Sequence, residues 1–174
     1  INLENIIKEN TIIFGNLPYN VSSQILIKLL KSCHLTTKYE DLILMFQKEL
    51  GEKIVAKFPS SKYGRLSIIT SLILNLEKKF LVSPNCFKPI PKVQSLVLHL
   101  KPKRKKLSNI ADINNLEKIT NILFSNKRKM INKSLKKILS NDELKLLKEI
   151  RMNIRPSELK PELYYKIAEI IEKR

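Results

Sequence analysis

The sequence has few cysteines, few acidic residues and no long apolar run, and these shortages exclude several classes of protein. Its two cysteines, Cys33 and Cys86, are too few for a disulfide framework and make no metal-ligand spacing. We therefore expect two reduced thiols with structural roles, and no metal. No apolar run approaches the roughly 18 residues of a membrane span, and no signal-peptide pattern occurs at the start. These absences predict a cytoplasmic protein that does not contact membranes.

The shortage of acidic residues gives the chain a large positive charge. Its 33 basic and 16 acidic residues leave a formal net charge of +17. Residues 101–174 carry 20 basic and 9 acidic side chains, whereas residues 1–100 carry 13 and 7, so the shorter part holds most of the excess. Such a charge favours a polyanionic partner, because lysine and arginine contact phosphates and release counterions. Most of the basic residues are lysine, so an AT-rich coding sequence is an alternative explanation.

The first part of the chain alternates between strand and helix patterns. Residues 11–14 form a short β-branched apolar run closed by Gly15, which predicts a buried strand. A helix pattern follows from Ser22, residues 41–46 form a second apolar run, and helical spacing then continues to about Lys57. Strand, helix, strand and helix in this order predict an α/β fold with a parallel sheet.

The patterns after this region predict the end of the sheet. Residues 66–76 are apolar almost throughout, so periodicity leaves helix and strand open there. Residues 80–82 and 93–100 have strand patterns, and the proline-rich residues 84–91 between them are unsuited to regular structure. We expect these two strands to form an antiparallel pair at one end of the sheet.

A composition change divides the chain in two. Residues 102–106 are basic and begin with a proline, which is typical of a linker. After them, apolar residues recur at helical spacing to the end of the chain. The sequence therefore predicts an α/β domain over residues 1–102 and a small helical domain over residues 103–174.

The residues after the first predicted strand, Asn16-Leu17-Pro18-Tyr19, suit the amino group of a nucleobase. That amine is a weak nucleophile, because its lone pair is delocalised into the ring. The Asn16 carboxamide oxygen and the Leu17 carbonyl oxygen, placed outside the ring plane, would localise the pair for attack on a methyl sulfonium. Pro18 would hold the backbone, and the Tyr19 ring offers a flat face for an extruded base. The alternative is an ordinary turn shaped by Asn16 and Pro18.

Four motifs in the chain resemble those of a known family: FGNLPYNVSSQIL, MFQKELGEKIVAKFPSSKYGRLS, CFKPIPKVQSLVLHLKP and FSNKRKMINKSLKKIL. In order and spacing they resemble the ribosomal RNA adenine N6,N6-dimethyltransferases of the small-subunit branch. The resemblance implies the C-terminal part of a Rossmann-like methyltransferase domain that uses S-adenosylmethionine, followed by a small all-α domain. It implies methylation of N6 of two adjacent adenines in the 3′-terminal hairpin of small-subunit rRNA, a step in ribosome biogenesis. It also favours helix for residues 66–74.

The same resemblance implies roles for individual residues. Asn16 would hold the target amine and touch the cofactor, while Leu17 and Pro18 would shape the turn. Tyr19 would stack on the flipped adenine, and Phe87 would close over its other face. A core position in a proline-rich loop is the alternative for Phe87.

Three features complete the resemblance. Gln94 stands where the family usually has an acidic residue, although an amide can keep a similar hydrogen bond. Arg65 is either structural or a phosphate contact. The family's glycine-rich cofactor loop would lie before Ile1, and none of the three glycines forms such a loop. We therefore expect the chain to begin inside a longer protein, to bind cofactor weakly and to be inactive alone.

One motif of the helical domain predicts a nucleic-acid contact. The pattern over residues 127–138 is helical, with basic and apolar side chains on nearly opposite faces. Such a helix can pack on its domain and present lysines to an RNA backbone, although a solvated charged face is the usual alternative. The predicted RNA-binding residues are Lys127, Arg128, Lys129, Lys133, Lys136 and Lys137.

These features together predict an rRNA adenine dimethyltransferase. We expect a monomer that acts on small-subunit rRNA or on the assembling small subunit. Two alternatives stay open: a non-catalytic RNA-binding or assembly factor that kept the fold, and a large-subunit adenine methyltransferase of the resistance type. Asn16, Tyr19 and Phe87 argue against the first, and the match through the helical tail disfavours the second.

Overall fold

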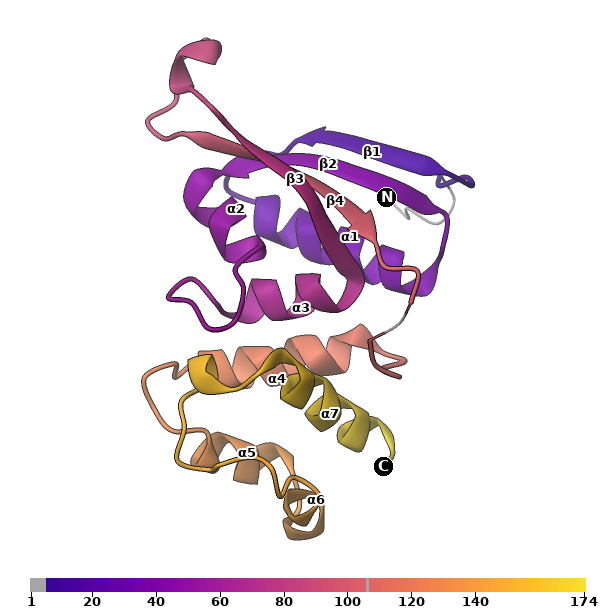
Figure 1. The fold of residues 1–174 in the computed structure, drawn as a ribbon, viewed down its shortest axis with the longest axis vertical. Coiled ribbons are helices and arrows are strands. Elements are labelled where there is room, and N and C mark those ends of the chain that lie inside the picture. Colours follow the sequence, from indigo (N-terminus) through magenta and orange to yellow (C-terminus); the bar gives the residue numbers. More distant parts are fainter. Residues whose placement is uncertain (1–5, 106) are drawn as a thin grey trace. The chain divides into compact units, whose positions relative to one another are not determined.

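The computed structural model describes residues 6–105 and 107–174, which form two compact units (Figure 1). The first unit consists of residues 6–55 and 70–105, and the second of residues 56–69 and 107–174. Helix α3 (Arg65–Ile73) begins in the second unit and ends in the first.

The first unit is built on a four-stranded mixed sheet with the strand order β1-β2-β4-β3. The strands are β1 (Thr11–Asn16), β2 (Tyr39–Gln47), β3 (Leu74–Val82) and β4 (Ser95–Pro102). β1 and β2 are parallel and are joined through helix α1 (Ser22–Leu35), while β4 is antiparallel to both β2 and β3. The predicted parallel pair, and the antiparallel pair at one end of the sheet, are confirmed.

Alternation along β2 explains how helices cover the sheet. Leu42, Leu44 and Phe46 are fully buried, and the residues between them are only partly buried. Successive side chains of a strand point to opposite faces, so these three form the face toward the core. Helices α1 and α2 (Lys48–Ile54) lie together on one side of the sheet in Figure 1.

The largest difference from the sequence prediction lies where α3 meets β3. The apolar run over residues 66–76 is helical as far as Ile73 and then continues directly as a strand, so the helix favoured by the resemblance is confirmed. No glycine or proline marks the change. β3 is an edge strand with mostly exposed side chains, so it lacks the alternation of a half-buried strand. The predicted strand over residues 80–82 is therefore only the end of a longer one.

The second unit is helical, as the pattern after residue 103 predicts. Its helices are α4 (Ile113–Phe124), α5 (Asn132–Ile138), α6 (Asn141–Lys145) and α7 (Pro161–Glu172). α4 and α7 pack against each other and supply much of the core. Their fully buried side chains include Leu116, Ile119, Leu123, Tyr164 and Ile167.

Two buried tyrosines join residues 56–69 to the second unit. The Tyr63 hydroxyl donates to the Leu159 carbonyl oxygen at 3.0 Å. The Tyr165 hydroxyl donates to the Ile68 carbonyl oxygen at 3.0 Å. Burial raises the pKa of Tyr63, so its hydroxyl keeps the proton that it donates.

The domain boundary predicted at residues 102 and 103 stays a prediction. The compact helical unit of the structure also includes residues 56–69, which precede that boundary in the sequence.

The described residues lack a membrane-spanning helix and a cluster of metal-binding side chains. Within residues 6–105 and 107–174, no helix is both long and apolar enough to cross a bilayer. The same residues contain no group of three or more side chains arranged to hold a metal ion.

Candidate active site and RNA-binding segment

The Asn16–Tyr19 turn lies at the carboxyl edge of the parallel strands. Asn16 is the last residue of β1, and its Cα lies opposite that of Met45 on β2. Ligands of open α/β sheets bind beyond this edge. The Asn16 side chain is exposed, so its carboxamide is available to a ligand instead of being packed in the core.

Contacts on both sides hold the turn in one conformation. The Leu17 amide donates to the Met45 carbonyl oxygen at 3.4 Å, and the Leu17 side chain is buried. Pro18 is exposed, and its ring restricts φ. At the start of α1, the Ser22 hydroxyl donates to the Tyr19 carbonyl oxygen at 3.1 Å. The backbone that follows Asn16 is therefore fixed before any substrate binds.

The Tyr19 side chain joins this turn to the start of β4. Its hydroxyl lies 2.6 Å from Oγ of Ser95, which is fully buried and stands 76 positions later in the chain. The partly exposed ring is thus restrained by its backbone and by its hydroxyl. A restrained aromatic ring can serve as a platform for an unstacked base. No local pattern in the sequence connects Ser95 with Tyr19, so this contact could not be predicted.

Phe87, the second predicted stacking residue, lies in the loop between β3 and β4. It follows the 3₁₀ helix η2 (Pro84–Cys86), and its amide donates to the Pro84 carbonyl oxygen at 3.1 Å. The Phe87 ring is partly exposed, which argues against a core position. The loop ends at Ser95, the partner of Tyr19, so the loop and the Asn16–Tyr19 turn meet at one edge of the sheet. The stacking role stays a prediction.

Gln94 fastens the end of this loop to the sheet. Its side-chain oxygen accepts a hydrogen bond from Lys48 Nζ at 2.9 Å, and its backbone oxygen accepts one from the Lys48 amide at 2.9 Å. Lys48 is the first residue of α2 and directly follows β2. The amide side chain of Gln94 therefore makes a hydrogen bond that a carboxylate could also accept. Lys48 is a second residue at this edge that the sequence did not indicate.

The predicted helix over residues 127–138 is wrong in its first half. α5 begins only at Asn132, and residues 127–129 lie in the turn before it. A contact distant in sequence explains the difference: the Ile131 amide donates to the Ile154 carbonyl oxygen at 2.9 Å. That amide is thus unavailable to a helical hydrogen bond with the preceding residues.

The predicted RNA-binding residues nevertheless form one exposed basic stretch, which we call the basic segment. It consists of Lys127, Arg128, Lys129, Lys133, Lys136 and Lys137, all exposed. On the opposite side Ile131, Leu135 and Leu139 are buried, so the predicted separation of basic and apolar faces is confirmed. Residues 124–129 also line a hollow of about 300 Å³. RNA binding by the segment stays a prediction.

Arg65, for which the sequence left two roles open, forms an ion pair that favours the structural role. Its Nη2 donates to Glu117 Oε1 at 2.7 Å, and both side chains are partly buried. The pair joins the start of α3 to α4 within the second unit.

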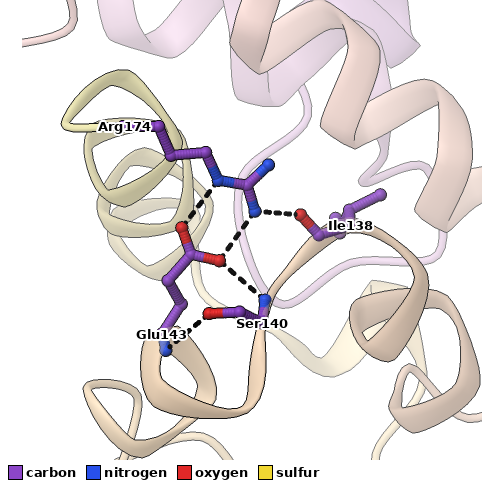
Figure 2. A network of polar contacts seen from close by, with 4 residues as sticks. All are labelled: Ile138, Ser140, Glu143 and Arg174. Atoms are coloured by element: carbon purple, nitrogen blue, oxygen red, sulfur yellow. Dashed lines mark hydrogen bonds and ion pairs between the residues drawn. The ribbon is translucent and has the colours of Figure 1, made fainter.

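A polar network joins the end of α5 to α6 and to the last residue of the chain, and Figure 2 shows it from close by. Arg174 donates from Nε and Nη2 to the two carboxylate oxygens of Glu143, at 2.7 Å each. It also donates to the Ile138 carbonyl oxygen at 2.6 Å. Glu143 and Ser140 form a capping box at the start of α6. Since Ile138 ends α5, the network fixes the helix that carries half of the basic segment.

Replacing Glu143 by glutamine tests this network. The hydrogen bond from Arg174 lowers the pKa of Glu143 from 4.5 to about 2. A carboxylate with a lowered folded-state pKa stabilises the fold above its unfolded pKa, and this contribution is lost as the pH falls toward 2. We expect Glu143→Gln to lower the urea midpoint near neutral pH, and the difference from the parent protein to shrink between pH 4.5 and about 2.

The matched control for this variant is Asp142→Asn, one residue earlier. Within residues 6–105 and 107–174 Asp142 forms an ion pair with Lys145 alone, and both side chains are highly exposed. Exposed pairs of this kind contribute little, so the control should barely shift the midpoint. If Glu143→Gln lowered the urea midpoint by the same amount at every pH, the ionised carboxylate would not be the group that stabilises the network.

Comparison with known proteins gives consistent matches over almost the whole chain. Residues 2–173 match the family model described as "Ribosomal RNA adenine dimethylase". A "Ribosomal RNA small subunit methyltransferase A" from Pelagibacter ubique is 40% identical over 161 residues, covering 92% of this chain and 61% of that protein. One of the same name from Buchnera aphidicola is 38% identical, covering 93% of this chain and 58% of that protein. The chain thus spans about three fifths of the length of these relatives.

Solved structures give the same fold. A dimethyladenosine transferase from Plasmodium falciparum has a TM-score of 0.76 at 25% identity, covering 93% of this chain and 66% of that one. The 23S rRNA methyltransferase ErmE has a TM-score of 0.64 at 20% identity, which bears on the fold alone. The predicted fold class, α/β of the Rossmann-like methyltransferase type followed by a small all-α part, is confirmed.

Proposed function

Because the chain belongs to the ribosomal RNA adenine dimethylase family, we propose that the protein it comes from methylates small-subunit rRNA. In this proposal methyl groups pass from S-adenosylmethionine to N6 of two adjacent adenines in the 3′-terminal hairpin. The observation that carries the proposal is the Asn16–Tyr19 turn. It places an exposed amide at the carboxyl edge of the sheet and is fastened to β4 by the hydroxyl of Tyr19.

The residues of the turn act on the amino group of the adenine. The Asn16 carboxamide oxygen and the Leu17 carbonyl oxygen accept its hydrogen bonds from outside the ring plane, which localises the lone pair on nitrogen. Because the backbone is fixed in advance, this alignment needs no reorganisation during the reaction. Tyr19 and Phe87 stack on the two faces of the base, and each contact is worth on the order of 1–3 kcal/mol. Extrusion of the base costs least where it is already unpaired.

The same edge of the sheet fits part of the cofactor site. Bound S-adenosylmethionine supplies a methyl group on a positively charged sulfur. The exposed amide of Asn16 is the group of this chain that would touch it. The glycines of residues 6–105 and 107–174 are Gly15, Gly51 and Gly64, which stand far apart in the sequence, so this part of the chain holds no glycine-rich cradle for the remainder of the cofactor. This supports the prediction that the chain alone binds cofactor weakly and is inactive.

The basic segment serves as the contact to the RNA backbone. Residues 101–174 carry 20 basic and 9 acidic side chains, and six exposed cations gather in the basic segment. Paired RNA is recognised mainly by its shape and backbone, so this segment would set the register while the turn performs the chemistry. The proposed partner is small-subunit rRNA, either free or in the assembling subunit, bound by a cytoplasmic monomer.

Methyl transfer by the full-length protein tests the proposal. The protein is incubated with S-adenosylmethionine labelled in its methyl group and with unmodified rRNA of both subunits, and the digested nucleosides are identified by mass spectrometry. We expect labelled N6,N6-dimethyladenosine from small-subunit rRNA only. Label in large-subunit rRNA would replace the proposal with the resistance-type activity. RNA binding without label would replace it with the assembly-factor function.

A further inference from the structure

The loop between β3 and β4, residues 83–94, carries two exposed lysines, Lys88 and Lys92. Figure 1 shows this loop extending beyond the other strands of the first unit. The loop contains no acidic residue. Among the described residues neither lysine takes part in an ion pair. Both ammonium groups are therefore free to meet an external anion.

Protection of an edge strand explains some of the exposed lysines on the hairpin formed by β3, the loop and β4. Lys78 and Lys79 lie on β3, which is an edge strand of the sheet. Lysines on an edge strand prevent it from pairing with other chains. Lys88 and Lys92 lie in no strand, so edge protection does not explain them.

The loop is fixed next to the candidate active site. Gln94 is bonded twice to Lys48, and Ser95 is bonded to Tyr19 at 2.6 Å. Three prolines restrict the backbone between these bonds and β3: Pro84, Pro89 and Pro91. Lys88 directly follows Phe87, the proposed stacking residue.

We infer that Lys88 and Lys92 bind phosphates of the single-stranded RNA that flanks the target adenine. The inference rests on the proposed function, because it takes the base at Phe87 to be the target. Proteins hold single-stranded RNA by combining cations along the backbone with aromatic platforms for the bases, and this loop offers both within six residues, 87–92. Ile90 and Val93 are exposed beside the lysines and offer apolar contact to unstacked bases. A lysine acts here as a point charge on a long stem and needs no fixed geometry.

The test compares two double variants of the full-length protein. Lys88→Ala/Lys92→Ala removes the proposed contacts, and Lys78→Ala/Lys79→Ala removes the same charge from the same hairpin. The dissociation constant for a target hairpin RNA is measured by fluorescence anisotropy at several salt concentrations, and kcat and KM for methylation are measured in parallel.

Each phosphate contact to a single strand contributes about 0.7 to the slope of log affinity against log salt. Loss of two contacts should therefore make the slope shallower by about 1.4. The parent then loses affinity faster than the variant as salt is added, and a fourfold rise in salt should reduce the ratio of their dissociation constants roughly sevenfold. KM should rise while kcat stays nearly constant. The Lys78→Ala/Lys79→Ala variant should keep the slope of the parent.

The outcomes separate this inference from the proposed function. An unchanged salt slope in Lys88→Ala/Lys92→Ala, with methylation intact in the parent, would overturn the inference alone. A fall in kcat without a change of slope would also overturn it, because the lysines would then only hold the loop in shape. Absence of methylation by the parent protein would count against the proposed function itself.

Discussion

Asn16→Ala in the full-length protein is expected to lower kcat for methyl transfer by a factor on the order of 10²–10³. The amide is exposed, so its loss should leave the fold intact. Its oxygen interacts with the amino group most strongly in the transition state, when positive charge develops on the nitrogen. Loss of such an interaction lowers kcat but leaves the affinity for the RNA nearly unchanged. RNA affinity should therefore stay within about twofold of the parent. Single-turnover methylation and anisotropy titrations measure the two quantities separately.

Asn20→Ala is the matched control for this experiment. Asn20 is also exposed and lies four positions later, after the turn and before α1. Its truncation removes the same chemical group close to the site and should change neither rate nor affinity appreciably. If Asn16→Ala lost rate and affinity in equal measure, Asn16 would be a binding residue and not the group that activates the amine.

Reversing the charge of Lys129 and Lys133 is expected to weaken RNA binding at low salt by more than about tenfold. Lys129 lies in the turn before α5 and Lys133 on the helix, so the two sample both parts of the basic segment. Each phosphate contact to a duplex contributes about 0.9 to the salt slope, so the slope should fall by about 1.8. Glutamate adds repulsion to the loss of attraction. Titrations of the RNA between low and physiological salt provide both the affinity and the slope.

Lys118→Glu/Lys148→Glu is the control with the same change of net charge. Both lysines are exposed and lie in the second unit outside the basic segment. A general electrostatic attraction would make the two double variants equally weak, whereas a defined interface would leave the control close to the parent. Equal weakening would remove the basic segment from the interface.

The parts of the fold that sequence could predict are those with local signals. The β-branched run ending at Gly15 marks β1, and the spacing after Ser22 marks α1, so the turn between them could be located from the sequence. The stripe of Leu135 and Leu139 likewise places α5 against its core. In both cases a few neighbouring residues decide the element. The buried strand predicted for residues 11–14 is wrong in its burial, because Ile12 and Phe14 of β1 are exposed.

The parts that could not be predicted depend on partners far away in the chain. The start of α5 is set by the contact of Ile131 with Ile154, and the ring of Tyr19 is held by Ser95. The strand predicted over residues 80–82 is shorter than β3, because an exposed edge strand has no alternating pattern of apolar and polar residues. For residues 66–74, where periodicity leaves helix and strand open, the family motifs favour the helix that the structure has.

The side-chain amide of Gln94 holds the loop between β3 and β4 by a hydrogen bond that depends little on salt concentration or pH. A carboxylate at this position would pair with the Lys48 ammonium as an ion pair, which salt screens and acid protonates. A neutral carboxamide has no charge to screen and no proton to take up near neutrality. The loop should therefore remain in place across the salt range of a binding experiment. Any dependence on ionic strength would then report the RNA leaving its lysines and not the loop leaving the sheet.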